Sequence, residues 1–421
     1  MTVVAIDDTD SRERGMCTTY LAALVADRLA ATSRVERRLL VRLNPAVEHK
    51  TRGNAALALH ADCDPRTALD VAAAAVAAYA ETADDRTSPG VVVAPGDPLD
   101  VPDAVAAFAR AAVRDHHAVD DAVALAERAG YRHRGWAGGR GRIGALAAVG
   151  AWAAFEEWTY ERISYRAFER CGTPREVDEA SVFEAADAGY PAAWDTVDRG
   201  EGEAVCVPAA PGPILHGIRG DDRATVERVA AAVDAEPVER AATFVTNQGT
   251  DAHLRDAALG AVRDGRSYRV DATVATAPET REGGHVFLAL ADGDDRLPAV
   301  AFEPTKRFRD RVRALRQGDE VTACGEVADG TLKLEKFAVR SLVRTERVTP
   351  DCPDCGRSMA SAGCDQGYRC RDCGTAAPGK AERELDRDLE RGWYEVPPCA
   401  RRHLAKPLVR GGFDVPTHPE R

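Results

Sequence analysis

Four cysteines form the sharpest chemical pattern in the chain. Cys352, Cys355, Cys370 and Cys373 make two CxxC pairs with 14 residues between them. Each CxxC turn can aim two thiolates at one ion, and two such turns complete the tetrahedral shell that zinc prefers. Four thiolates leave no coordination position open, so the pattern predicts a structural zinc site. The alternative is two unrelated pairs of reduced cysteines.

Three aspartates near the N-terminus form a second cluster. Asp7, Asp8 and Asp10 follow the short apolar run 3–6, and Thr18 and Thr19 stand a few residues further on, before a helical pattern. Crowded carboxylates repel one another unless a cation joins them, and a magnesium ion that also binds phosphate suits them. The free N–H groups of a helix start suit an anion. The alternative is an Asp-rich turn followed by a threonine N-cap.

Two further segments carry phosphate-binding chemistry. The sequence Gly139-Arg140-Gly141-Arg142-Ile143-Gly144 precedes a helix, and successive glycines there can form a nest of N–H groups beside two guanidinium groups. It matches GxGxxG only formally, because no apolar strand precedes it. Lys50 and Arg52 belong to a cationic polar loop whose default interpretation is a solvated surface.

Composition sets the frame for these sites. The 421 residues carry a net charge of −12, and 45% of them are hydrophobic, as in a globular protein with several domains. Lysine occurs at only six positions. An acidic, lysine-poor surface indicates adaptation to a salty cytoplasm, although a high-GC genome explains the choice of arginine equally well. We find neither a leader peptide nor a membrane span and expect a cytoplasmic protein.

The elements that must position these residues change character along the chain. Up to about residue 158 the pattern indicates an α/β domain, with predicted strands at 3–6, 39–43, 55–60 and 91–94 and helices at 18–31, 68–79, 104–113 and 145–155. From about 160 to 262 it indicates an α+β domain, with strands at 204–207 and 244–246 and helices at 223–233 and 251–259.

The remaining sequence predicts a barrel and a ribbon. Five alternating segments and one helix (305–316) are typical of an oligonucleotide-binding (OB) barrel, with strands at 268–275, 285–291, 299–302, 319–325 and 331–337. After the cysteines we expect a charged helix over 381–391 and a basic, flexible arm over 399–406. A barrel beside a zinc ribbon implies contact with nucleic acid.

Several motifs together resemble one archaeal family, the isoleucine-tRNA 2-agmatinylcytidine synthetases. They are IDDTDS…GMCTTYLA (6–23), RLNPAVEHKTRGNAAL (42–57), GRGRIGALAAVGA (139–151), FVTNQGTD (244–251), GGHVF (283–287), AFEPTKRFR (301–309), the four cysteines and GWYEVPPCARRHLAKPL (392–408). The resemblance runs from end to end. It implies a kinase-like α/β domain (1–158), a ferredoxin-like domain (159–264), an OB-fold (265–346), and a zinc ribbon with a basic tail (347–421).

The resemblance also implies the reaction. ATP goes to AMP, and one phosphoryl group activates the 2-carbonyl oxygen of the wobble cytidine in the minor isoleucine tRNA, whose anticodon is CAU. The primary amine of agmatine then displaces phosphate, and the modified tRNA reads AUA. The cofactors would be ATP, Mg²⁺ and Zn²⁺, and no protein partner is implied.

By the same resemblance, residues take roles. Thr18 matches a threonine that becomes phosphorylated, while Asp7, Asp8 and Asp10 would hold magnesium and triphosphate. The remaining ATP contacts would be Thr19, Lys50, Arg52, Gly139, Arg140, Gly141 and Arg142. Relatives carry lysines just before Gly-Arg-Gly, where this chain has Trp136-Ala137-Gly138, so Arg140 or Arg142 would replace them. The candidates for agmatine are Asp195, Asp198, His216 and Thr246. The competing hypothesis is a nucleic-acid-binding ATPase scaffold without ligase activity.

Overall fold

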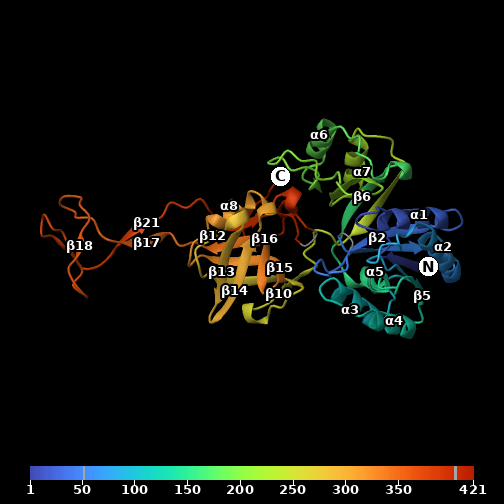
Figure 1. Cartoon of the computed structure of the whole chain (residues 1–421), viewed down its shortest axis with the longest axis horizontal. Helices are drawn as coiled ribbons and strands as arrows, with labels where there is room; N and C mark the ends of the chain where they lie inside the picture. The colour runs from blue at the N-terminus through green and yellow to red at the C-terminus, as the bar shows by residue number, and fades with distance from the viewer. Residues whose placement is uncertain (51–52, 403–404) are drawn as a thin grey trace.

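A computed structural model describes residues 1–50, 53–402 and 405–421 of the chain. Three bodies follow one another along its long axis: a large sheet with its helices, a barrel, and a ribbon at the far end (Figure 1). Among the described residues, no helix combines the length and the apolar character needed to cross a membrane. Arg52 lies outside the described residues.

A nine-stranded sheet carries the N-terminal 246 residues, in the order β5-β4-β1-β3-β2-β9-β6-β8-β7. Its strands are β1 (Thr2–Asp7), β2 (Val35–Arg42), β3 (Ala55–Ala61), β4 (Gly90–Pro95), β5 (Arg132–Gly135), β6 (Thr159–Tyr165), β7 (Ala193–Trp194), β8 (Ile214–Gly220) and β9 (Arg240–Thr246). The parallel pair β2 and β9 joins its two halves, with Leu39 opposite Val245. The α/β and α+β regions therefore share one sheet.

Helices cover both faces of the first half of this sheet. They are α1 (Thr18–Ala30), α2 (Pro65–Tyr79), α3 (Asp103–Ala112), α4 (Val119–Arg128) and α5 (Arg142–Ala154). In β1, Val4 and Ile6 pack toward α1 and α2, whereas Val3 and Ala5 pack toward α3, α4 and α5. This alternation is the two-residue period of a strand, and it buries β1 on both sides.

The second half of the sheet is covered by α6 (Glu179–Gly189) and α7 (Arg223–Ala232). Two predictions for this region are wrong. Residues 204–207 form turns rather than a strand, and 251–259 hold the short strand β10 (Leu254–Asp256) instead of a helix. Asp251 has a φ of 61°, outside the helical range, and β10 pairs in parallel with the first barrel strand. Long-range pairing overrides the local helical pattern.

The barrel contains the five predicted strands. They are β11 (Arg266–Val274), β13 (Val286–Asp292), β14 (Asp295–Ala301), β15 (Glu320–Ala328) and β16 (Thr331–Ser341). Each pairs with two others and the ring closes from β15 back to β11, while α8 (Phe308–Arg313) packs against the barrel. The remaining elements attached to it are β12 (Glu279–Thr280), β22 (Gly392–Glu395) and β23 (Thr417–His418).

The ribbon projects from the barrel on a two-stranded stalk (Figure 1). The stalk pairs β17 (Thr345–Val348) with β21 (Ala381–Glu384), so the predicted helix over 381–391 is wrong. In that segment Arg387 reaches across to buried Asp319 of the barrel at 2.6 Å, an attraction that local charge patterning does not reveal. Beyond the stalk lie β18 (Ala360–Ser361), β19 (Tyr368–Arg369) and β20 (Ala376–Ala377).

The basic tail packs into the molecule rather than extending as an arm. Arg401 is buried and pairs with Asp195 of the large sheet region at 2.6 Å and with Glu395 of β22 at 2.8 Å. Arg402 pairs with Glu326 and Glu335 of the barrel. The prediction of a flexible arm is therefore wrong for these residues. Short 3-10 helices complete the chain at Phe168–Arg170, Leu259–Ala261, Glu282–Gly284, Glu303–Thr305, Pro398–Ala400 and Leu408–Arg410.

Candidate active site and zinc centre

A cavity of about 340 Å³ opens where the two halves of the large sheet meet. The ends of β1 and β2, the starts of α1 and α5, and one face of β6 and β8 form its walls. The predicted residues that line it are Asp7, Asp8, Asp10, Thr18, Thr19, Lys50, Arg140 and Gly141. Residues from positions 7 to 141 therefore converge on one cavity.

The aspartates form the acidic end of this cavity. Asp7 ends β1, and its carboxylate accepts a hydrogen bond from the backbone N–H of Asp8 at 2.7 Å. Burial raises the pKa of Asp7 well above its ordinary value, and the neighbouring Asp8 and Asp10 raise it further. Burial also raises the pKa of Asp8 to about 6, against the opposing effect of Arg140. Such buried, mutually repelling carboxylates are the donor set that a hard cation stabilises.

The glycine-rich segment brings α5 directly against these aspartates. A Cβ atom added to Gly144 would lie 2.0 Å from Oδ2 of Asp7, and one on Gly141 would lie 2.6 Å from the Asp7 carbonyl oxygen. Both positions therefore require glycine, because the backbone there lies so close to Asp7 that a side chain would collide with it. Arg140 donates to Oδ2 of Asp8 at 2.9 Å, whereas Arg142 turns back to the carbonyl oxygen of Gly139. Of the two arginines, Arg140 is the one that lines the cavity.

The two threonines begin helix α1 at the cavity wall. Both are buried, and Thr18 is the first residue of the helix. Its hydroxyl accepts a hydrogen bond from the hydroxyl of Thr9 at 3.1 Å. The Thr19 hydroxyl lies 3.0 Å from the sulfur of Cys17. The start of α1 thus presents two hydroxyl groups and the positive end of the helix to the acidic end of the cavity.

Sequence reasoning missed a second polar group on the opposite wall. Glu161 of β6 is buried, and its two carboxylate oxygens contact Arg42 of β2 at 3.3 Å and Arg219 of β8 at 3.4 Å. Glu161 and Arg219 belong to none of the quoted motifs, and Arg42 only begins the segment 42–57, so no local motif brings the three together. A charged residue within a strand that is otherwise buried is the one signal that the sequence offered.

Lys50 lies where the large sheet region and the barrel approach each other. It lines the cavity, and burial lowers its pKa. Glu326 and Lys333 of the barrel and Arg402 of the tail are close enough to shift that pKa, Glu326 upward and the two cations downward. The lysine is therefore part of the cavity wall and near charged groups of the barrel and tail, rather than on an isolated surface loop.

None of the four agmatine candidates is among the described residues that line the cavity. Asp195 is paired with buried Arg401, and Asp198 contacts Arg307 at 2.8 Å. Burial lowers the pKa of His216 to about 4, which makes it neutral at pH 7, and the Thr246 hydroxyl accepts a hydrogen bond from the backbone of Gln248. The structure does not bring these four together: arginines of the protein already occupy both carboxylates.

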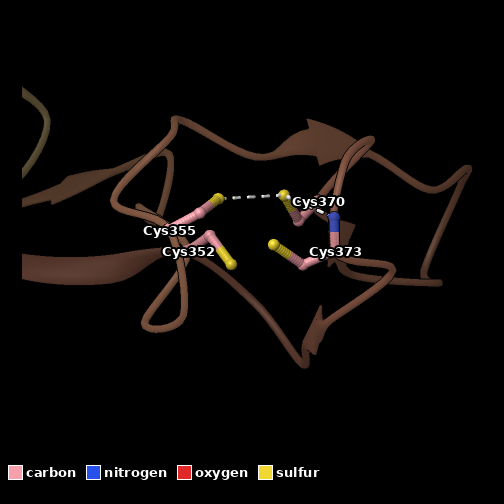
Figure 2. A group of neighbouring side chains, drawn as sticks. All are labelled: Cys352, Cys355, Cys370 and Cys373. Atoms are coloured by element: carbon pink, nitrogen blue, oxygen red, sulfur yellow. Dashed lines mark hydrogen bonds between the residues drawn. The ribbon is translucent and has the colours of Figure 1, made fainter.

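The four predicted cysteines meet within the ribbon, where their side chains point toward one another (Figure 2). All four sulfur atoms lie within 4.8 Å of one another, and those of Cys355 and Cys370 are 3.6 Å apart. Four thiolates around one zinc at about 2.3 Å would be separated by roughly 3.8 Å. The donor set and spacing therefore fit a tetrahedral zinc ion.

Family models match three parts of the chain. Residues 3–137 match the TiaS TCKD domain, residues 139–253 the TiaS FLD domain, and residues 349–389 the TiaS C-terminal zinc ribbon domain. The last match contains all four cysteines of the metal centre.

Full-length relatives extend the similarity. The isoleucine-tRNA 2-agmatinylcytidine synthetase TiaS of Haloquadratum walsbyi is 57% identical, with 100% of both chains covered. The solved structure of TiaS in complex with its isoleucine tRNA and ATP has a TM-score of 0.90 at 40% identity and covers 100% of this chain and 99% of the other. A complex of TiaS with the same tRNA, AMPCPP and agmatine has a TM-score of 0.87 at 38% identity, with the same coverage.

Proposed function

Because the chain belongs to the TiaS family of isoleucine-tRNA 2-agmatinylcytidine synthetases, we propose that it joins agmatine to a cytidine of the minor isoleucine tRNA at the expense of ATP. The relatives of known structure bind this tRNA, ATP and agmatine, and the similarity to them covers the whole chain. The observation that carries the proposal is the single cavity that combines buried aspartates, a helix start and a charged opposite wall.

We assign the domains as kinase-like (1–158), ferredoxin-like (159–264), OB-fold (265–346), and zinc ribbon with basic tail (347–421). Helix α5 packs on β1 and β4, which supports placing residues up to 158 with the first domain. The barrel strand β11 begins at Arg266 and the stalk strand β17 at Thr345. The cavity lies between the first two domains, so it can receive two substrates from different sides.

ATP occupies the acidic end of the cavity in this proposal. Asp7, Asp8 and Asp10 would hold Mg²⁺, which supplies charge neutralisation for the transferred phosphoryl group. Thr18 and Thr19 face the phosphates at the start of α1, and Thr18 is the acceptor of a phosphoryl group. Arg140, paired with Asp8, takes the place of the absent lysines, with Lys50 and Gly141 completing the lining.

The chemistry proceeds in two stages. The 2-carbonyl oxygen of the wobble cytidine attacks a phosphoryl group of ATP, which converts a poor leaving group into phosphate. The amine nitrogen of agmatine then forms a bond to C2, the C2–O2 bond breaks, and O2 departs within inorganic phosphate while the amine loses a proton. With AMP as the nucleotide product in this proposal, the second phosphoryl group of ATP goes to the Thr18 hydroxyl and from there to water. The cytidine must leave its stack to reach the cavity.

Agmatine, a dication, needs carboxylates and an apolar path between them. Glu161 supplies a carboxylate in the cavity, and Ile163 and Ile214 supply apolar wall beside it. Gly217 opens this wall, because a Cβ atom there would lie 3.3 Å from Oε1 of Glu161. We therefore place agmatine against Glu161, which lines the cavity, rather than at Asp195 and Asp198, which are not among its lining residues.

The deciding experiment incubates the purified protein in high salt with ATP, radiolabelled agmatine and a transcript of the minor isoleucine tRNA. We expect label in the tRNA and release of AMP. A transcript with uridine in place of the wobble cytidine serves as the control and should stay unlabelled. ATP hydrolysis without label in either transcript would support the alternative, a nucleic-acid-binding ATPase scaffold, and contradict the ligase.

A further inference from the structure

The loop that follows β9 holds the end of β2 at the cavity wall. The side chain of Asn247 behaves like a strand partner of Arg42: its Oδ1 accepts from the Arg42 backbone N–H at 2.7 Å, and its Nδ2 donates to the Arg42 carbonyl oxygen at 3.0 Å. Asn247 is 0% exposed. A buried amide that satisfies both backbone groups of one residue fixes that residue's position.

The next residue of the loop holds the guanidinium group of Arg42. Nε of Arg42 donates to Oε1 of Gln248 at 2.9 Å, and one terminal nitrogen contacts Glu161 at 3.3 Å. Gln248 is buried, and its own carbonyl oxygen accepts a hydrogen bond from the Thr159 hydroxyl at 2.9 Å. These contacts orient the guanidinium, and Arg42 lines the cavity.

The barrel fixes the far end of this loop. Asp251 accepts two hydrogen bonds from Nζ of Lys336, at 2.8 and 2.7 Å, and one from the backbone N–H of Lys406 at 2.6 Å. Lys336 belongs to β16 and is 0% exposed. The loop 247–251 is therefore anchored at both ends, to the barrel through Asp251 and to the cavity through Arg42.

We propose that Asn247 and Gln248 are positioning residues that hold Arg42 so that its guanidinium stabilises the phosphate that departs with O2 of the cytidine. This inference rests on the proposed function. The developing charge in that step is anionic, and a guanidinium oriented in advance by buried acceptors loses little freedom when it binds a phosphate. Glu161 by itself would repel an anion. Glu161, Arg42 and Arg219 together, however, carry one net positive charge.

The test compares Gln248→Met with Arg42→Lys and with the double variant in the agmatine incorporation assay. Methionine keeps the volume of glutamine but lacks its acceptor, and lysine keeps the charge of arginine but lacks Nε. We expect each single change to lower kcat about tenfold or more while the KM for agmatine changes less than twofold. Because Gln248 acts through Arg42, the double variant should lose no more than Arg42→Lys alone.

The inference would be overturned if the fold-loss of kcat in the double variant equalled the product of the two single fold-losses. A kcat for Gln248→Met within twofold of the wild type would overturn it as well. Should Gln248→Met fail to fold, Gln248→Leu tests the same contact, because leucine also lacks the oxygen that accepts from Nε of Arg42. A reduced kcat then supports the role and an unchanged kcat refutes it.

Arg162→Gln is the matched control. Arg162 neighbours Glu161 on the same strand and donates to the hydroxyl of Thr243 instead of lining the cavity, so its loss should leave kcat unchanged. The wild type is measured in parallel. If the wild type incorporates no agmatine, the proposed function fails. If the wild type does, and the kcat values of Gln248→Met and Arg42→Lys equal that of Arg162→Gln, only the inference fails.

Discussion

The cavity and the ribbon each gather side chains that repel one another when charged, but they differ in what holds these side chains together. The buried strand β1 and the cores on both of its faces keep Asp7 and Asp8 in place. Among the described residues, the ribbon's own apolar cluster has three buried members, Cys352, Met359 and Cys370, and two of these are the ligands themselves. In the cavity the fold itself holds a repulsive cluster in place, whereas in the ribbon a zinc ion on the four cysteines would supply much of the stability.

The largest effect should come from breaking the ribbon. Cys370→Ser removes one thiolate, and because structural zinc contributes on the order of 10 kcal/mol to such small domains, we expect loss of bound zinc and unfolding of the ribbon alone. Metal analysis and tRNA binding measure it, with tRNA affinity expected to fall about tenfold.

Cys364→Ser is the control for the ribbon. Cys364 is exposed and contacts Asp365 rather than the four clustered sulfur atoms, so the zinc content of this variant should match that of the wild type. Unchanged zinc in Cys370→Ser would refute the metal site.

The next largest effect tests whether the cavity, unlike the ribbon, keeps its fold when one of its charged side chains is removed. Asp8→Asn removes a charge from the acidic end without changing its shape, so the fold and the affinity for tRNA should persist while AMP release falls about 1,000-fold, which is about 4 kcal/mol in the barrier. Single-turnover assays and a melting curve measure the two properties. Retained activity would count against a metal role for Asp8, and global unfolding would contradict the comparison with the ribbon.

The pH dependence of stability offers a third test. Burial raises the pKa of Asp8 from 3.8 to about 6, so the folded state binds its proton more tightly than the unfolded state. Without magnesium, the free energy of unfolding should therefore decrease as the pH rises from about 4 to above 6, by at most about 3 kcal/mol for this residue.

Urea denaturation in the presence of a chelator measures this slope. Asp8→Asn should show a smaller slope than the wild type, and magnesium should restore stability above pH 6. Equal slopes in the two proteins would mean that the buried carboxylate does not hold its proton.

The smallest effect concerns the close packing behind the aspartates. Gly144→Ala would place a Cβ atom 2.0 Å from Oδ2 of Asp7, so the carboxylate must move, and we expect kcat to fall about 30-fold, about 2 kcal/mol. Gly379→Ala is the control, because a Cβ atom there meets nothing within 4 Å. A kcat in Gly144→Ala equal to that of the control would show that the position of Asp7 is not critical.

Sequence reasoning succeeded where the information is local. The CxxC spacing places two thiolates in each turn, and the apolar run before Asp7 makes a buried strand that ends at the cavity. The five barrel strands follow from alternation of apolar residues, and their predicted positions lie close to those observed. In each case the property depends on residues within about ten positions of one another.

It failed where distant residues decide the structure. The segment 381–391 has a helical charge pattern, yet β21 pairs with β17 across more than thirty residues. Asp195 was a reasonable partner for a guanidinium, and it does bind one, but that guanidinium belongs to Arg401, 206 positions away. Glu161 belongs to no local motif, because its partners Arg42 and Arg219 come from other strands.

The sequence by itself therefore determined the family, the cysteine cluster and the acidic cluster, since short motifs and strand periodicity encode them. Tertiary structure decided which charges remain available to substrates. Both Glu161 and Asp195 are paired with arginines from distant positions, but Glu161 and its partners Arg42 and Arg219 line the cavity, whereas Asp195 is paired with Arg401 beneath the tail. Burial makes such pairing obligatory, because an unpaired charge away from water is too costly to keep.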